Sequence, residues 1–313
     1  MTTRRTPGTA SLLETRARAL RRYLPAAVAG DDKGVHQARV ASRRLREAVP
    51  VLATGLKGSK SKKAGRKIRR LTRALGTVRE LDVTLNLIDE LSSSDDLSRP
   101  ALQDVRLHVV GERDKLRETM LSELAAVDTE KLDRRLLSVS TALAADTAGA
   151  WKKALASRLI SRSRRLTAAI QTAGQLYVPE HLHQVRIGAK KLRYGLELAA
   201  DARIAGAAAH VRTVKRIQTI LGRLHDLQIL QSHVAAVQAT PQARAGAHEA
   251  LAAIAGRIEE QCRLLHGKYV SSVPALHAVT AAVRSDVASR LTRSSRPLKM
   301  VLPRTRKRAG QAG

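Results

Sequence analysis

The sequence predicts an all-α protein, and three observations carry that prediction. Apolar residues recur at helical spacing along almost the whole chain, as they do where one face of each helix is buried. No window alternates convincingly between apolar and polar residues at period two, the pattern of a half-buried strand. The 43% hydrophobic content comes mainly from Ala, Leu and Val, while aromatic residues make up 2%. This mixture suits helices better than sheets.

Four helices are predicted in the first part of the chain. The first contains the apolar residues of 12–24 and ends at Pro25 or at the turn of residues 30–32. The second covers 33–52, the third 63–91 and the fourth 99–127, with a basic loop at 55–65. Ser98 is the expected N-cap of the fourth helix, with Pro100 in its first turn. Residues 1–130 are therefore interpreted as a first four-helix unit.

A similar pattern follows a helical connector that we predict at 131–150. Four further helices are expected at 151–173, 179–202, 205–237 and 241–266, which together give a second four-helix unit over 151–270. Residues 271–313 are predicted to hold a short helix near 275–291 and a basic tail, which has no acidic residue from Arg290 onward. Such a composition is typical of disordered segments.

An internal repeat indicates how the chain is organised. The segment VHQARVASRRLREAV from Val35 matches LHQVRIGAKKLRYGL from Leu182, which places His36 and His183 147 residues apart. A second match joins LGTVREL to LGRLHDL, with Gly76 and Gly222 146 residues apart. Two matches at almost one offset predict two copies of one helical unit, and hence two pseudo-symmetric four-helix bundles with long antiparallel helices.

The repeated segments place basic residues on one side of a helix and apolar residues on the other. At about 100° per residue, His36, Arg39 and Arg43 lie in one arc, and the core candidates of the same segment lie opposite. In the second copy the same arc holds His183, Arg186 and Lys190. We expect the apolar sides to form the bundle cores.

The charge balance indicates a polyanionic partner. Lys and Arg total 57 against 27 Asp and Glu, a formal net charge of +30, and the self-repulsion of such a chain is relieved by a bound polyanion. Nucleic acid is the usual candidate, but single-stranded nucleic acid is bound largely by stacking on aromatic side chains. The sequence has no Phe, one Trp and four Tyr. The partner is therefore expected to be a polyanion that the protein does not read by stacking on bases.

The repeated motifs resemble the CHAD family, the conserved-histidine α-helical domain. The residues that carry the resemblance are HQARVASRRLR with LGTVREL in the first half and HQVRIGAKKLRY with LGRLHDL in the second. The resemblance covers about residues 10–270. It implies two four-helix bundles related by a pseudo-two-fold axis, basic surfaces that line a central cavity or groove, and binding of inorganic polyphosphate.

The resemblance also implies which side chains contact the ligand. In the first half these are His36, Arg39, Arg43, Arg44, Arg46, Arg69, Arg70, Arg73 and Arg79, and in the second half His183, Arg186, Lys190, Lys191, Arg193, Tyr194, Lys215, Arg216 and His225. Two differences make the halves unequal. Arg79 stands where the second copy has His225, and Thr219 stands where a counterpart of Arg73 would fall.

Simpler interpretations compete with the ligand interpretation at single positions. A basic helix face is usually just solvated, although here the face recurs with a histidine in register. His225 is as well explained as a half-buried histidine with a protein partner, and Tyr194 as a residue at the edge of the core. The lone Cys262 is expected in the core.

No catalytic residue, metal or cofactor is predicted. His225 and Asp226, with Glu80 and Asp82, superficially suggest a metal-dependent phosphohydrolase. The neighbouring Arg and Lys side chains would repel a divalent cation, so we expect the carboxylates to pair with arginines instead. The chain has no Gly-rich phosphate loop, no GxSxG motif and no acidic ExExK signature of the CYTH domain that accompanies many CHAD proteins. A stand-alone CHAD protein is expected.

Three functions are weighed on this basis. The leading one is non-catalytic binding of inorganic polyphosphate by a cytoplasmic protein, with polyphosphate granules as one destination. The alternative is sequence-nonspecific, nucleoid-type binding of nucleic acid through phosphate contacts, to which the basic tail would contribute weakly. The third is a polyphosphate phosphohydrolase. Neither a secretory signal nor a membrane span is expected.

Overall fold

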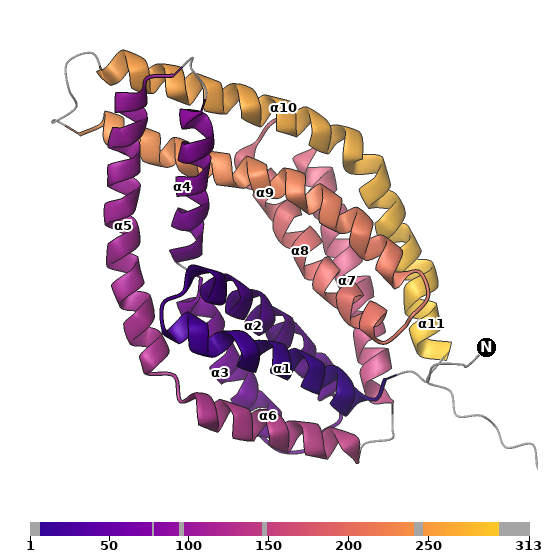
Figure 1. Ribbon diagram of the computed structural model, residues 1–313. Coiled ribbons are helices and arrows are strands. Elements are labelled where there is room, and N and C mark those ends of the chain that lie inside the picture. The colour runs from indigo at the N-terminus through magenta and orange to yellow at the C-terminus, as the bar shows by residue number, and fades with distance from the viewer. Residues whose placement is uncertain (1–6, 77, 94–96, 146–148, 241–246, 294–313) are drawn as a thin grey trace, which may run out of the picture.

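The computed structural model describes residues 7–76, 78–93, 97–145, 149–240 and 247–293. Every regular element in these ranges is helical (Figure 1), which confirms the all-α prediction. The first half holds α1 (Thr9–Val28), α2 (Asp32–Leu52), α3 (Lys60–Ala74), α4 (Val78–Ser92), α5 (Arg99–Ala125) and α6 (Thr129–Ala144). The second half holds α7 (Ala150–Ala173), α8 (Pro179–Asp201), α9 (Ala207–Gln238), α10 (Ala247–Ala282), a π-helical turn (Val283–Val287) and α11 (Ala288–Arg293). The predicted basic tail lies outside the described residues from 294 onward, while residues 290–293 still belong to α11.

Local signals in the sequence explain where several helices begin. The Ser98 hydroxyl accepts a hydrogen bond from the amide of Ala101 at 3.4 Å, with Pro100 in the first turn of α5. This is the cap that the sequence predicts. Asp128 caps α6 in the same way, at 2.8 Å from the amide of Lys131. A side-chain acceptor at this position satisfies one of the free amide groups of a helix N-terminus.

Two rings of four helices form the body of the molecule. In the first ring α1 contacts α2, α2 contacts α3, α3 contacts α6 and α6 contacts α1. In the second, α7, α8, α9 and α10 contact one another in the same cyclic order. The segment 131–150, predicted as a connector, therefore holds most of α6, the fourth member of the first bundle. The apolar stripe Leu132, Leu136, Val139 and Leu143 is buried there, which explains its helical spacing.

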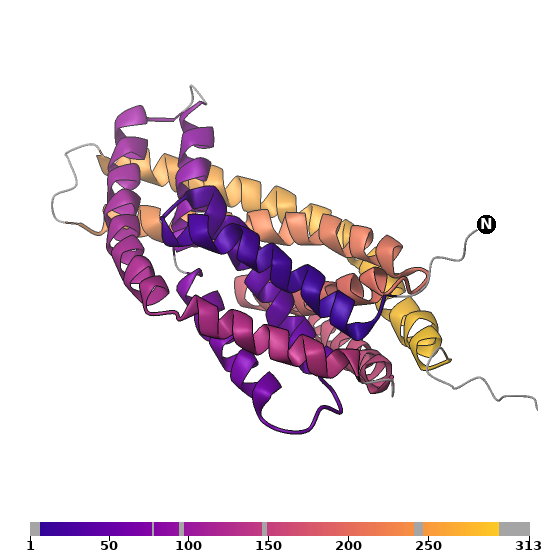
Figure 2. The same cartoon turned by 60° about the horizontal axis from the view of Figure 1, so that its bottom comes forward.

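A second core joins the two halves of the chain. The α4–α5 pair packs on the far ends of α9 and α10 (Figure 1), through buried residues such as Ile88 and Val105 from the first half and Leu230 and Ile254 from the second. Cys262 is buried in this core, as predicted. The helices α9 and α10 lie side by side along their length, which Figure 2 shows from a second direction. The sequence did not lead us to expect a core shared between the halves.

The third helix is not continuous, and the single helix predicted over 63–91 is wrong. The chain leaves the helix after Ala74, where the amide of Gly76 bonds to the carbonyl of Arg73 at 2.8 Å, and α4 starts at Val78. In the second half α9 passes unbroken through the matching Gly222. A Cβ at Gly76 would lie 2.9 Å from the Arg73 carbonyl oxygen, whereas nothing lies within 4 Å of one at Gly222. This break lets α3 stay in the first bundle while α4 leaves it.

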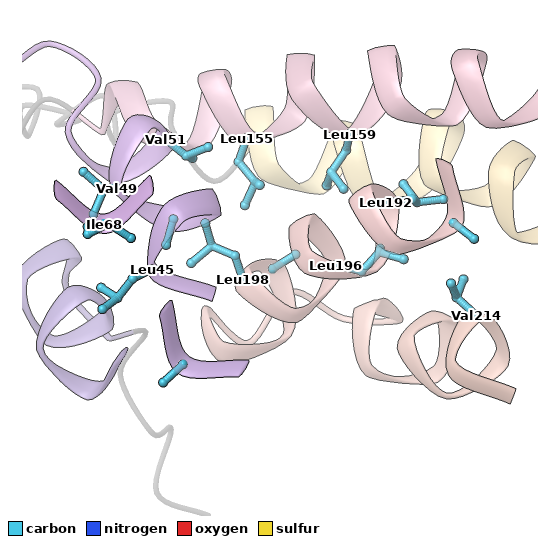
Figure 3. Packing of buried hydrophobic residues seen from close by; sticks show 14 of the residues in the cluster. Leu45, Val49, Val51, Ile68, Leu155, Leu159, Leu192, Leu196, Leu198 and Val214 are labelled. Carbon is cyan, nitrogen blue, oxygen red and sulfur yellow. The ribbon is translucent and has the colours of Figure 1, made fainter. Parts of the chain in front are cut away.

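The two bundles meet across a continuous apolar core. Figure 3 shows Val51 of the first bundle beside Leu155 of the second, within one buried cluster that also holds Leu45 and Leu196. The apolar sides of the repeated segments, on α2 and α8, are buried as predicted. The predicted end near residue 266 is wrong, because α10 continues through Pro274 to Ala282. Leu276 and Val279, which lie beyond this proline, are in the core. Among the described helices none is long and apolar enough to cross a bilayer.

Candidate functional site

The two repeated basic faces meet at the junction of the bundles. Helix α2 contacts α8 there, and α4 contacts α9 beside them. The basic residues on these helices lie close enough that charged groups on one helix shift the pKa values of groups on a facing helix. We call this set the central cluster: His36, Arg39, Arg43 and Arg46 from α2, Arg79 from α4, His183, Arg186, Lys190 and Tyr194 from α8, and His225 from α9. All of them were predicted as site residues.

The central cluster concentrates positive charge in a half-buried place. Burial, followed by the charges of the neighbouring guanidinium groups, lowers the pKa of Lys190 to about 7; these groups belong to Arg43, Arg186, Arg39 and Arg46. Burial followed by Arg43 likewise lowers the pKa of Arg39 to about 10. A cation is driven toward its neutral form only where water and carboxylates do not compensate its charge. The cluster therefore favours an anion.

Several donors in the cluster have no partner within the protein. The buried Nε atoms of Arg39 and Arg43 and the Nδ1 atom of His36 have no hydrogen-bond partner among the described residues. Most buried polar atoms in proteins are paired, and an arginine Nε–H can only donate. The cluster thus presents unsatisfied donors that anionic oxygens can accept from.

Two carboxylates lie inside the cluster, at matching positions of the repeat. Glu80 accepts from His225 at 3.5 Å, and this contact, together with Arg39 and Arg186, outweighs burial and holds the pKa of Glu80 below its ordinary value. Burial raises the pKa of Asp226, while the nearby Arg186 opposes the shift. The sequence analysis expected these acids to pair with arginines, but among the described residues Glu80 has His225 as its partner and Asp226 has no ion pair with an arginine. His225 has the protein partner that its simpler interpretation requires.

The pKa values of His36 and His183 lie below the ordinary value for histidine. Burial, then Arg79 and Arg39, lowers the pKa of His36. Burial, then His225, lowers that of His183, whose ring centroid lies 4.8 Å from that of His225. A bound anion would reverse this balance, because it stabilises the charged imidazole.

Ion pairs at the rim tie the two halves together. Glu197 of α8 accepts from Arg44 of α2 at 3.0 Å and lies 3.1 Å from Arg193 of its own helix. Glu47 of α2 accepts a hydrogen bond from Arg162 of α7. Like-charged helices thus pack with the protein's own carboxylates between them. Arg44 and Arg193, both predicted to contact the ligand, share Glu197 as an ion-pair partner.

Other predicted residues lie outside the central cluster. Arg69, Arg70 and Arg73 are exposed on α3, and Lys215 and Arg216 are exposed on α9. None of these five residues is among the charged groups that most shift the pKa values of His36, Arg39, Arg186 and Lys190. Lys215 lines a separate cleft of about 520 Å³ with Arg16 and Arg44. Lys191 is exposed and lines another, on α7.

Sequence reasoning missed Arg16 and Arg162. Arg16 lies 2.6 Å from Asp201 of α8, and Arg162 pairs with Glu47 of α2, so each reaches an acid on the second helix of the other half. Their separation of 146 residues equals the offset of the second repeat match, and Leu20 and Leu166 share it. Extending the repeat to the first helix of each half would have found them. In the described part of the chain no group of three or more His, Cys, Asp or Glu could hold a metal ion.

Comparison with known proteins shows which family the chain belongs to. The family model of the CHAD domain matches residues 11–235. The chain belongs to the CHAD family. The match spans the central cluster and both copies of the repeat, so the resemblance seen in the motifs is confirmed. No curated protein matches the chain significantly.

Two solved structures share the CHAD fold with this chain. PptA from Streptomyces chartreusis is 16% identical, with a TM-score of 0.60, over 85% of this chain and 98% of that one. The CHAD domain from the plant Ricinus communis is 20% identical, with a TM-score of 0.53, over 88% of this chain and 90% of that one. At these identities the likeness concerns the fold alone.

Proposed function

We propose that this CHAD protein binds inorganic polyphosphate, without catalysis, through the central cluster. The observation that carries the proposal is the meeting of two repeated basic faces around buried donors that the protein leaves unpaired. Cations three and four positions apart on a helix are about 5–6 Å from one another, a spacing that suits a repeating anion. Arginine, which supplies most of the cluster cations, can donate two hydrogen bonds to one phosphate.

The composition favours a phosphate chain over nucleic acid as the ligand. Tyr194 is the one aromatic residue among the cluster members other than histidine; it is 8% exposed, with the guanidinium of Arg193 5.2 Å from its ring centroid. It therefore offers little surface on which a base could stack. Binding in the cytoplasm, with recruitment to polyphosphate granules, belongs to the same proposal.

A three-way titration tests the proposed function. Long-chain polyphosphate and duplex DNA are titrated against the full chain and against a chain that ends at Arg293, at physiological salt, while phosphate release is followed. We expect tight binding of polyphosphate by both chains, weaker binding of DNA that depends on residues 294–313, and no phosphate release. Equal affinity of the shortened chain for DNA would overturn the choice of ligand, and metal-dependent phosphate release would overturn the absence of catalysis.

The affinity for polyphosphate is expected to rise about tenfold as the pH falls from about 8 to about 6. Lys190, with its pKa lowered to about 7, and His36 and His183, with pKa values below the ordinary one, gain protons over this range. In the free protein this protonation opposes folding, because the unfolded chain binds these protons at higher pH. Bound phosphate offsets that cost, so binding and proton uptake are coupled.

Calorimetry in two buffers of different ionisation enthalpy measures this coupling. Net proton uptake on binding at pH 7.5 is expected, and K190R should reduce it because arginine is already charged. An affinity that does not change with pH would remove Lys190, His36 and His183 from the ligand contacts.

A further inference from the structure

A second basic cleft lies beside the central cluster, on α7. Its volume is about 620 Å³, and its charged lining consists of Glu47 from α2, Arg158, Arg162 and Arg165 from α7, and Lys191 from α8. We call it the α7 cleft. Sequence reasoning assigned only Lys191 of this set to a ligand. Four cations thus share one carboxylate.

The ion pairs inside the α7 cleft leave part of its charge uncompensated. Arg162 is 11% exposed and uses both ends of its guanidinium within the protein, on Glu47 and on the carbonyl of Lys191 at 2.6 Å. Arg158 reaches the same carboxylate only at 3.8 Å. Burial and then the neighbouring Arg162 lower the pKa of Arg158. The Glu47 carboxylate therefore compensates the charge of Arg162, and the charge of Arg158 is left largely uncompensated.

The remaining lining provides further donors toward the cleft. Arg165 and Lys191 are exposed, and neither has an ion pair among the described residues. Ser157 and Ser161 add hydroxyl groups on the same helix. Arginine, lysine and hydroxyl donors around one hollow are the groups that bind phosphate oxygens.

The α7 cleft adjoins the central cluster along two helices. Lys191 of the cleft directly follows Lys190 of the cluster on α8, and Glu47 of the cleft follows Arg46 on α2. Arg46 of the cluster lies 3.9 Å from Glu47 of the cleft and also lowers the pKa of Lys190. A flexible anion held in the cluster can therefore continue into the cleft.

We propose that the α7 cleft is a second phosphate-binding site, which takes later phosphate groups of a polyphosphate chain already held at the central cluster. The proposal rests on the proposed function and gives it a chain-length preference. A short chain fills the cluster alone, whereas a long chain occupies both sites, and the second contact forms at high effective concentration.

Two charge-removing double variants of α7 test this second site. R158Q/R165Q changes the cleft, and K153Q/R164Q removes the same charge from exposed positions of α7 that do not line it. Each is titrated with tripolyphosphate and with long-chain polyphosphate, beside the full-length wild type and R39E/R186E. We expect R158Q/R165Q to bind the long chain about tenfold more weakly, as one lost charge-assisted hydrogen bond implies, and to bind tripolyphosphate as the wild type does.

The other possible results would overturn either the second phosphate site or the proposed function of the central cluster. Equal losses for R158Q/R165Q and K153Q/R164Q, no loss for either, or an equal loss on both probes would overturn the second site. Unchanged binding of both probes by R39E/R186E would instead overturn the central cluster, and hence the proposed function. Should R158Q/R165Q melt lower than the wild type, R165E takes its place, because the exposed Arg165 has no ion pair in the described residues that its loss would break.

Discussion

Reversal of Arg39 and Arg186 to glutamate is expected to weaken polyphosphate binding by about a hundredfold or more, since two charge-assisted contacts become repulsive. The two arginines hold comparable places in the repeat, one on α2 and one on α8. Both lie close to Tyr194 and Glu80 in the central cluster. The variant R39E/R186E therefore places a negative charge on each side of the junction, where the ligand is expected to pass.

A matched variant separates this effect from net charge. R18E/R164E makes the same change in total charge at exposed positions of α1 and α7, which are also 146 residues apart. We expect its affinity to stay within about threefold of the wild type, because exposed charges act weakly at physiological salt. Isothermal titration gives the affinities and circular dichroism the helical content. Tight binding by R39E/R186E would assign the receptor to other basic residues.

The site could be predicted in its centre but not at its edges. His36, Arg39 and Arg43 lie on one face of their helix, and their counterparts lie on the same face of theirs, because helical periodicity fixes which residues share a face. Periodicity does not say which helix a face meets. The meeting of α2 with α8 places these residues together, while α3 carries Arg69, Arg70 and Arg73 to an exposed surface.

The fold could be predicted in its class and its repeat, but not in how the helices pair. Residues 63–91 keep a helical pattern across Gly76, because Ile68, Leu71, Leu81 and Ile88 are all buried. They are buried in different cores, Ile68 with α2 and Ile88 with α9 and α10. A hydrophobic pattern records that a residue is buried and not the partner that buries it. The break and the shared core were therefore invisible in the sequence.

Carboxylates at the junction explain how two basic faces can pack without a ligand. Glu80 and Asp226 lie within the cluster, while Glu47 and Glu197 lie at its rim. A full neutralisation would leave nothing for phosphate to bind. The central cluster instead keeps more cations than acids, which leaves the positive charge that the proposed binding of polyphosphate requires.

Removal of the Glu47 carboxylate is expected to cost about 3 kcal/mol of unfolding free energy in E47A, the loss typical of a buried charge left unpaired. Glu47 and Arg162 are 13% and 11% exposed, so water cannot replace the missing partner well. The pair joins α2 of one half to α7 of the other, across the interface between like-charged bundles. Urea unfolding followed by circular dichroism measures the loss, and E47Q, which keeps an acceptor of similar size, should lose less.

The matched control is an exposed ion pair of the same residue types. Glu260 lies 2.8 Å from Arg257 on α10, with side chains 59% and 44% exposed, and E260A should cost less than about 1 kcal/mol. Because both variants remove one negative charge, a difference between them measures the burial of the pair and not the net charge. An equally small loss in E47A and E260A would contradict a tie between the halves at Glu47. In that case the apolar core alone would hold the basic faces together, since Leu45 and Leu196 lie in the same cluster beneath them.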